Sequence, residues 1–189
     1  MNSENIRDGN FRNPWRVGGW GTAGALLLLP AVAMRFTGEV QWTVSDFMIA
    51  AMMIAILGLG IELTVRATRN SNYRGGGGVA LLTGFLVTWI NGAVGIIGNE
   101  SHPANLMFFA VIGIAIAGAF VARFKARGMA WAMGIAGLGQ FAVPLIAIAI
   151  WSPPLTVELV KTLAFNAVFA GLWLLSAGLF RRAAERANP

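Results

Sequence analysis

The sequence predicts an all-α integral membrane protein, a bundle of six transmembrane helices connected as up-down hairpins. Hydrophobic residues make up 57% of its 189 residues, charged residues make up 12%, and the mean hydropathy is +0.67. A soluble domain of this size needs far more polar surface. Six apolar runs come close to the roughly 20 residues that a helix needs to cross a bilayer. Basic residues fall in every second connection between these runs.

The six runs define a transmembrane domain at residues 17–182. It lies between a polar N-terminal tail, residues 1–16, and a short C-terminal tail, residues 183–189. Backbone polar groups in hydrocarbon must be bonded within the protein, so helices are expected, and the runs lack the alternation of a membrane β-strand. The expected spans are 17–34, 46–65, 78–97, 104–121, 129–151 and 159–180.

Several residues mark the expected helix ends. Asp46 begins the second span, where its charge suits a helix N-terminus. The glycine run 75–78 is expected to form a flexible segment before the third span, because it lacks the Gly-Lys-Ser/Thr ending of a phosphate-binding loop. Pro103 precedes the fourth span, and Pro153 and Pro154 separate the last two spans.

The charged residues predict the orientation. The bases of the tails and of the second and fourth loops are Arg7, Arg12, Arg16, Arg66, Arg69, Arg74, Arg123, Lys125, Arg127, Arg181, Arg182 and Arg186. The other loops carry Glu39, Asp46, Glu100 and Glu158, with Arg35 and Lys161 as bases. This positive-inside pattern places both termini in the cytoplasm and requires an even number of spans. It also argues against a nucleic-acid partner, because the net charge of +6 is divided among loops.

The most polar stretch at membrane depth joins the third and fourth spans on the outer side. Its polar residues are Asn91, Asn99, Glu100, His102 and Asn105. Two interpretations stay open: a glycine packing face with a capped outer loop, or the mouth of a pore or substrate cleft. In the second interpretation, Asp46 of the first outer loop would add a carboxylate, and the acidic outer loops would favour cations.

Three further polar residues fall inside apolar runs. Glu62 lies four residues before Arg66, which fits an ion pair reaching the inner interface, or alternatively a carboxylate that couples to an ion. Gln140 and Asn166 fit hydrogen bonds between helices, or alternatively contacts to a substrate.

The sequence shows no catalytic constellation. It has no cysteine, and its single histidine, His102, forms with Glu100 fewer ligands than the three or four of a zinc site. No nucleophile–base pair is visible. We therefore predict neither catalytic nor metal-binding residues, assign no cofactor, and do not expect an enzyme.

The stretch TWINGAVGIIGNESHPANLMFFAV, with GEVQWTVSDF ahead of it and ARFKARGMAWAM behind it, resembles a family of short uncharacterised bacterial inner-membrane proteins. The resemblance extends from about Trp20 to Arg182. It implies a bacterial inner membrane, and it supplies no activity, cofactor or functional residue.

These features favour a non-catalytic membrane protein that assembles with another membrane protein or with itself. Small residues at four-residue spacing, such as Gly113 and Ala117 or Ala167 and Gly171, are typical of helix-packing faces. One alternative is a small transporter or cation channel with its path near the polar stretch. Another is a lipid-binding protein or membrane enzyme.

Overall fold

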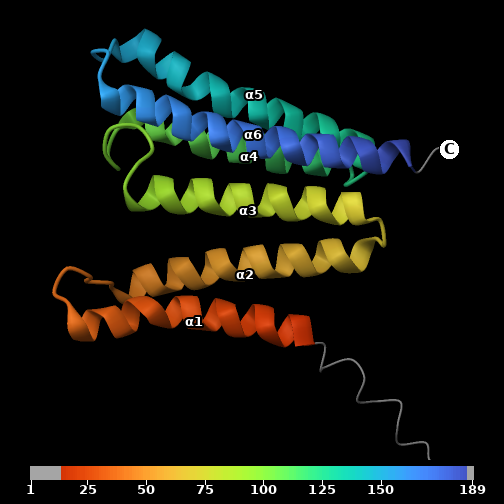
Figure 1. Cartoon of the computed structure of the whole chain (residues 1–189), viewed down its shortest axis with the longest axis horizontal. Helices are drawn as coiled ribbons and strands as arrows, with labels where there is room; N and C mark the ends of the chain where they lie inside the picture. Colours follow the sequence, from red (N-terminus) through yellow and green to blue (C-terminus); the bar gives the residue numbers. More distant parts are fainter. Residues whose placement is uncertain (1–13, 187–189) are drawn as a thin grey trace, which may run out of the picture. The chain divides into compact units, whose positions relative to one another are not determined.

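The structure, a computed structural model, describes residues 14–186 and is built from six long helices (Figure 1). These are α1 (Pro14–Phe36), α2 (Val44–Ala67), α3 (Ser71–Ala93), α4 (Leu106–Val121), α5 (Ala126–Trp151) and α6 (Val157–Glu185), with a short 3-10 helix, η2 (Pro103–Asn105), before α4. No strand occurs within residues 14–186, and all six helices are long and apolar enough to cross a membrane. The predicted all-α, six-helix membrane fold is confirmed. Arg7 and Arg12 of the expected N-terminal tail lie outside the described residues.

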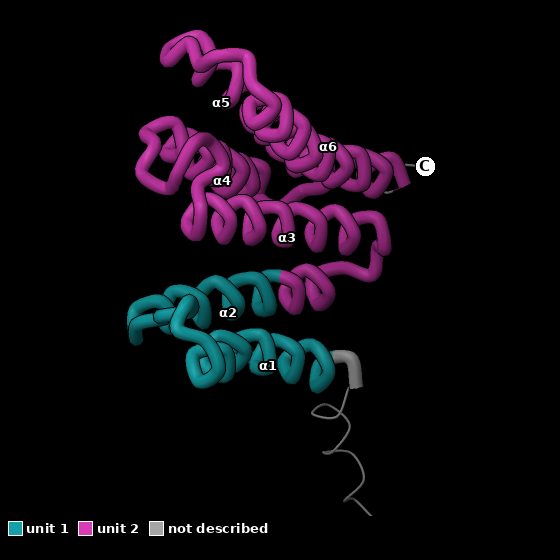
Figure 2. Tube along the Cα trace, turned by 60° about the vertical axis from the view of Figure 1, so that its left-hand side comes forward, with its two compact units in different colours: residues 1–60 teal, residues 61–189 magenta. Residues whose placement is uncertain are grey.

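The chain divides into two compact units, residues 1–60 and residues 61–189 (Figure 2). Unit 1 contains α1 and most of α2, and unit 2 contains the end of α2 and the helices α3 to α6. The boundary falls inside α2. The predicted transmembrane domain, residues 17–182, extends over both units.

Unit 1 is a helical hairpin. The indole of Trp20 covers Gly58, where an added Cβ would lie 3.0 Å from Cη2 of the ring. The second helix begins at Val44 rather than at the expected residue 46, because Thr43 caps it. The Oδ2 atom of Asp46 accepts hydrogen bonds from the backbone nitrogen and the hydroxyl of Thr43, at 2.7 and 2.8 Å, and so closes a reciprocal cap.

Unit 2 is organised around α6, which packs against both α3 and α5, while α4 packs against α5. The buried residues of α6 recur at three- and four-residue spacing, so they form one continuous inner face. They are Asn166, Phe169, Ala170, Trp173, Ser176, Phe180 and Ala183. Consecutive helices are neighbours from α4 to α6, as expected, whereas α3 finds its main partner in α6.

The third helix corrects the expected span of 78–97. It begins at Ser71, because Oδ1 of Asn70 accepts hydrogen bonds from the backbone nitrogens of Asn72 and Tyr73 at 3.0 and 3.2 Å. The glycine run 75–78 is therefore helical and not a flexible segment. A Cβ on Gly76 would lie 3.1 Å from the ring of Phe180, and one on Gly77 would lie 2.6 Å from Cγ2 of Thr64. These glycines allow two neighbouring segments to approach α3 closely.

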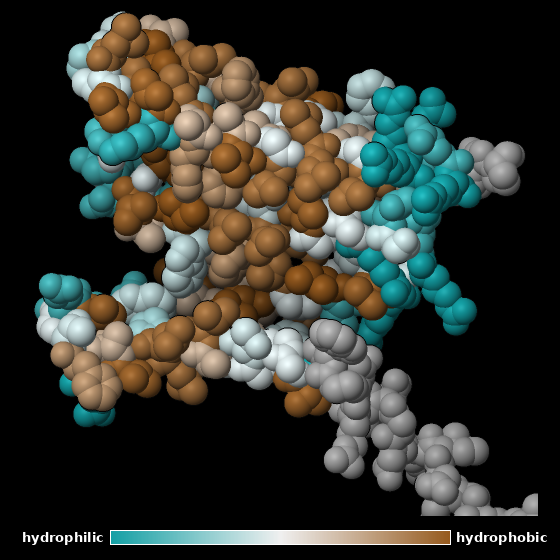
Figure 3. Space-filling view, viewed as in Figure 1, coloured by the Kyte–Doolittle hydropathy of each residue, from teal (hydrophilic) through white to brown (hydrophobic). Residues whose placement is uncertain are grey.

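One end of unit 2, here called the basic end, collects the start of α3, the α4–α5 turn and the end of α6. Its bases are Arg66, Arg69, Arg74, Arg123, Lys125, Arg127, Arg181, Arg182 and Arg186. Figure 3 shows this hydrophilic end beside the apolar flanks of α3 to α6. Arg74 also has a structural role, because its guanidinium donates to the carbonyls of Val65 and Thr68 at 2.7 Å each, at the end of α2. The last helix continues to Glu185, so the expected C-terminal tail begins inside it.

Candidate functional site

The polar stretch between α3 and α4 is a loop wrapped around the side chain of Asn105. Its Oδ1 accepts hydrogen bonds from the backbone nitrogens of Ile96 and Ile97 at 3.1 and 2.9 Å. Its Nδ2 donates to the carbonyls of Ile97 and Asn99 at 3.1 and 2.6 Å. The side chain is buried, so these four bonds replace the water that an open loop would use.

Two neighbours complete this arrangement. Asn91, buried at the end of α3, donates from Nδ2 to the carbonyl of Asn105 at 2.9 Å. Gly95 has a φ of +74°, and a Cβ there would lie 2.5 Å from the carbonyl oxygen of Asn99 and 2.7 Å from Nδ2 of Asn105. Only glycine adopts a positive φ without a steric penalty, and only a residue without Cβ fits this close to Asn99 and Asn105. The bonds of Asn91 and Asn105 favour a structural role over the lining of a pore.

The remaining predicted residues of this stretch lie toward the surface. Oδ1 of Asn99 accepts from the backbone nitrogen and the hydroxyl of Ser101 at 3.1 and 2.8 Å. Glu100 is exposed. His102 caps η2, since its Nδ1 accepts from the backbone nitrogen of Ala104 at 3.2 Å. Asp46 belongs to unit 1, where it caps α2 as described above.

Gln140 and Asn166 form a reciprocal bridge between α5 and α6. Nε2 of Gln140 donates to Oδ1 of Asn166 at 2.7 Å, and Nδ2 of Asn166 donates to the backbone carbonyl of Gln140 at 2.8 Å. That carbonyl lacks its usual helical partner, because residue 144, four positions later, is a proline without an N–H group. Asn166 therefore satisfies a group that Pro144 would otherwise leave unbonded in an apolar interior.

Other polar groups are buried in unit 2 as well. The hydroxyl of Ser176 donates to the carbonyl of Gly76 at 2.8 Å and so links α6 to α3, and the hydroxyl of Thr83 donates to the carbonyl of Val79 within α3. Among the described residues, no hydrogen-bond partner reaches Oδ1 of Asn91, Oε1 of Gln140 or Nε1 of Trp173. Glu62 forms the expected ion pair with Arg66 in the last turns of α2.

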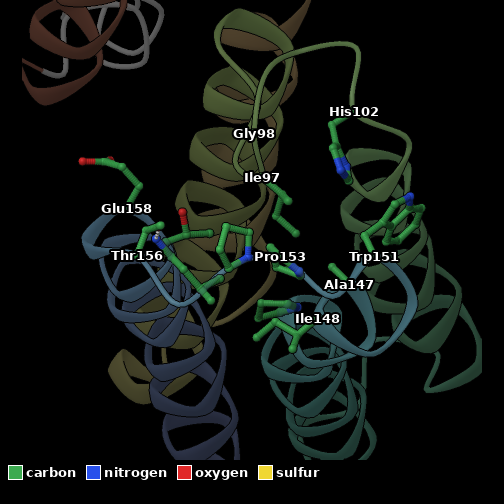
Figure 4. A pocket seen from close by; sticks show the side chains of 13 residues that line it. Ile97, Gly98, His102, Ala147, Ile148, Trp151, Pro153, Thr156 and Glu158 are labelled. Atoms are coloured by element: carbon green, nitrogen blue, oxygen red, sulfur yellow. Dashed lines mark hydrogen bonds between the residues drawn. The ribbon is translucent and has the colours of Figure 1, made fainter.

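A cleft of about 210 Å³ lies near the other end of unit 2, away from the basic end (Figure 4). It is bounded by the end of α5, the start of α6 and the loop that packs around Asn105. The residues that line it are Ile97, Gly98, His102, Pro144, Ala147, Ile148, Trp151, Pro153, Pro154, Thr156, Glu158, Leu159 and Thr162. Most of these are apolar, and of the predicted outer-site residues only His102 is among them.

Within residues 14–186, no group of three or more His, Cys, Asp or Glu side chains is placed to hold a metal ion. Comparisons with protein-family models, with curated proteins and with solved structures found no match for this chain. The resemblance noted from the sequence therefore stays a prediction.

The sequence reasoning identified the buried amides but not what they bond to. It also missed the roles of Pro144 and Arg74 and the cleft. The four-residue spacing of Gln140 and Pro144 was a usable signal, because a proline always frees the carbonyl four residues before it. Nothing comparable marks the cleft, whose walls come from three separate segments.

Proposed function

We propose that the protein is a non-catalytic subunit of a bacterial inner membrane that works by associating with another membrane protein or with a second copy of itself. The surface of α1 carries this proposal. Gly18, Gly21 and Gly24 recur every three residues, and within unit 1 no atom lies within 4 Å of the position that a Cβ would take on any of them. None of the residues in the most apolar part of α1 is buried.

This surface is unusual for a helix that faces only lipid. Glycine lowers helix stability by about 1 kcal/mol relative to alanine, so three glycines on one side carry a cost. Association of membrane helices depends on close packing and not on the hydrophobic effect, and small residues make that packing possible. An open glycine face on an apolar helix therefore fits contact with a helix outside unit 1, and we propose that this helix belongs to another chain.

The basic end of unit 2 supports the proposed orientation. It has nine arginine and lysine residues, and the acids Glu62 and Glu185 are ion-paired with Arg66 and Arg181. A strong excess of bases at one end of a bundle is typical of its cytoplasmic side. We therefore infer that the basic end and both termini are cytoplasmic.

The test uses the absence of cysteine from the sequence. Ala25 follows Gly21 by four residues and so shares its side of α1, which makes Ala25→Cys a conservative reporter of that face. In native membranes treated with a short maleimide–diazirine reagent, whose maleimide attaches to this cysteine and whose photoactivated end needs no thiol on the partner, we expect this variant to crosslink to a second copy or to another protein. A homodimer mass would identify self-association, and a heterodimer would identify the partner through mass spectrometry.

The matched control is Leu26→Cys, five residues after Gly21 and on another side of the helix, with 55% of the side chain exposed. It should remain uncrosslinked under the same conditions. The proposal is wrong if Ala25→Cys gives no adduct at native expression, or if both variants crosslink equally, which is the pattern of random collision.

A further inference from the structure

The cleft of unit 2 opens where α5 and α6 stop packing closely. Deeper in the bundle, Gly137 lets Leu174 approach, and a Cβ on Gly137 would lie 3.0 Å from Cδ2 of that leucine. The Gln140–Asn166 bridge follows one turn later. Toward the connection between them α5 and α6 diverge (Figure 1), and Pro144 and Thr162 are among the residues that line the cleft.

The lining contributed by α5 is apolar, and the polar lining residues come from the loop before η2 and from the start of α6. Pro144, Ala147 and Ile148 line the deeper part, and Trp151 stands at the end of the helix. Seven residues of helix separate Pro144 from Trp151, which is about 10 Å. Tryptophan at the end of a membrane helix is typical of the interface with the head groups. The deeper part of the cleft therefore lies at the level of the hydrocarbon, and its mouth lies at the interface.

Among the polar residues that line the cleft, His102 offers a hydrogen-bond donor. Because Nδ1 of His102 accepts a hydrogen bond from Ala104, Nε2 is the ring nitrogen that carries a hydrogen and can donate it. The ring of His102 meets the ring of Trp151 edge-on, with 5.1 Å between centroids. The carboxylate of Glu158 points away from the cleft (Figure 4) and pairs with Lys161 at 2.8 Å.

We propose that this cleft binds one phospholipid of the bilayer. An acyl chain lies against Pro144, Ala147 and Ile148, and an ester or phosphate oxygen accepts a hydrogen bond from Nε2 of His102. A phospholipid offers hydrocarbon for the apolar α5 lining and acceptor oxygens for the donor on His102. Its ester and phosphodiester oxygens only accept hydrogen bonds, which complements that donor. The site is in unit 2 and is independent of the proposed association through α1.

The test combines retention with covalent mapping. The purified full chain is reconstituted into nanodiscs with phosphatidylglycerol carrying a diazirine in one acyl chain, irradiated, digested and analysed by mass spectrometry. We expect adducts concentrated on Ala147, Ile148 and Leu159, and a single retained phospholipid in native mass spectra from mild detergent.

Two matched pairs of variants test the assignment. Ala147→Trp fills the cleft and should abolish the cleft adducts, whereas Ile146→Trp adds the same side chain at a neighbouring position that is 44% exposed and should leave them intact. His102→Ala should lower lipid retention about fivefold, the effect of one hydrogen bond, and His102→Gln should restore it because glutamine can donate at the same place. This second pair keeps the test decisive if Ala147→Trp fails to fold.

Three results would overturn the proposal. Equal adducts in the Ala147→Trp and Ile146→Trp proteins would show ordinary lipid contact around the bundle. Equal retention in the His102→Ala and His102→Gln proteins would remove the head-group contact. A retained molecule whose mass is not that of a phospholipid would assign the cleft to a different amphiphile.

Discussion

The side-chain amide of Asn166 on α6 donates a 2.8 Å hydrogen bond to the main-chain carbonyl of Gln140 on α5. A membrane helix that contains an internal proline leaves one carbonyl unbonded in a medium that offers no water. Here the adjacent helix supplies the missing donor. The bond therefore compensates for Pro144 at the same time as it joins α5 to α6.

This relationship predicts a specific coupling. Asn166→Ala should destabilise the protein by about 2 kcal/mol, because it leaves a buried carbonyl without a donor. In a Pro144→Ala background the backbone N–H returns to the carbonyl of Gln140, so the same substitution should cost about half as much. Unfolding of the four proteins of this cycle in mixed detergent micelles measures both values, and strictly additive effects would contradict the explanation.

Gly95 should tolerate no side chain. Gly95→Ala places a Cβ at 2.5 Å from the carbonyl oxygen of Asn99 in a left-handed conformation, so we expect a loss of about 2 kcal/mol or more. Gly92→Ala is the control, because no atom lies within 4 Å of its Cβ position. The thermal unfolding midpoints of the two purified variants are compared with that of the unchanged protein. Similar midpoints for Gly95→Ala and Gly92→Ala would show that the loop adapts to the added side chain.

Asn105→Asp tests whether the loop depends on hydrogen-bond donors. The substitution preserves shape but replaces the two bonds donated to Ile97 and Asn99 with contacts between oxygens. We expect faster hydrogen exchange at the amides of Ile96 and Ile97, measured by mass spectrometry. Asn99→Ala removes an exposed side chain that bonds only to Ser101 and keeps the backbone carbonyl that Asn105 uses, so it should leave exchange at these amides nearly unchanged. If Asn105→Asp also leaves it unchanged, the side chain does not hold the loop.

Single cysteines at the two ends of unit 2 should distinguish the sides of the membrane. Glu100 and Lys125 are both exposed, at opposite ends of α4. We expect a membrane-impermeant maleimide to label Glu100→Cys in intact spheroplasts and to label Lys125→Cys only after permeabilisation. The reverse pattern would invert the proposed orientation.

The number and type of helices could be predicted because they depend on composition and length. The exact spans were harder, since hydropathy does not register capping. Asn70 starts α3 at Ser71, well before the expected residue 78, and the left-handed Gly95 follows soon after the helix ends at Ala93. A hydropathy pattern marks only apolar residues, so it does not detect a helix whose first turns are polar, as those of α3 are.

Which glycines lie at helix contacts was also hard to predict from the sequence. Gly113 and Gly171 belonged to expected packing faces, yet no atom beyond their own helix backbone lies within 4 Å of their Cβ positions. Gly77 and Gly137 instead lie at the close contacts. Spacing along one helix shows which residues share a face, but which face turns inward depends on the partner helix. The buried amides were recognisable because polar groups are costly in hydrocarbon wherever they occur.

The central place of α6 affects how the protein is made. The ribosome delivers α3, α4 and α5 to the membrane before α6, and both α3 and α5 have their main contacts with α6. Until α6 inserts, the carbonyl of Gln140 has no partner from Asn166, and Gly76 lacks its bond from Ser176. Nascent chains that stop before α6 would thus expose polar groups to lipid, the kind of defect that membrane proteases and insertion chaperones act on.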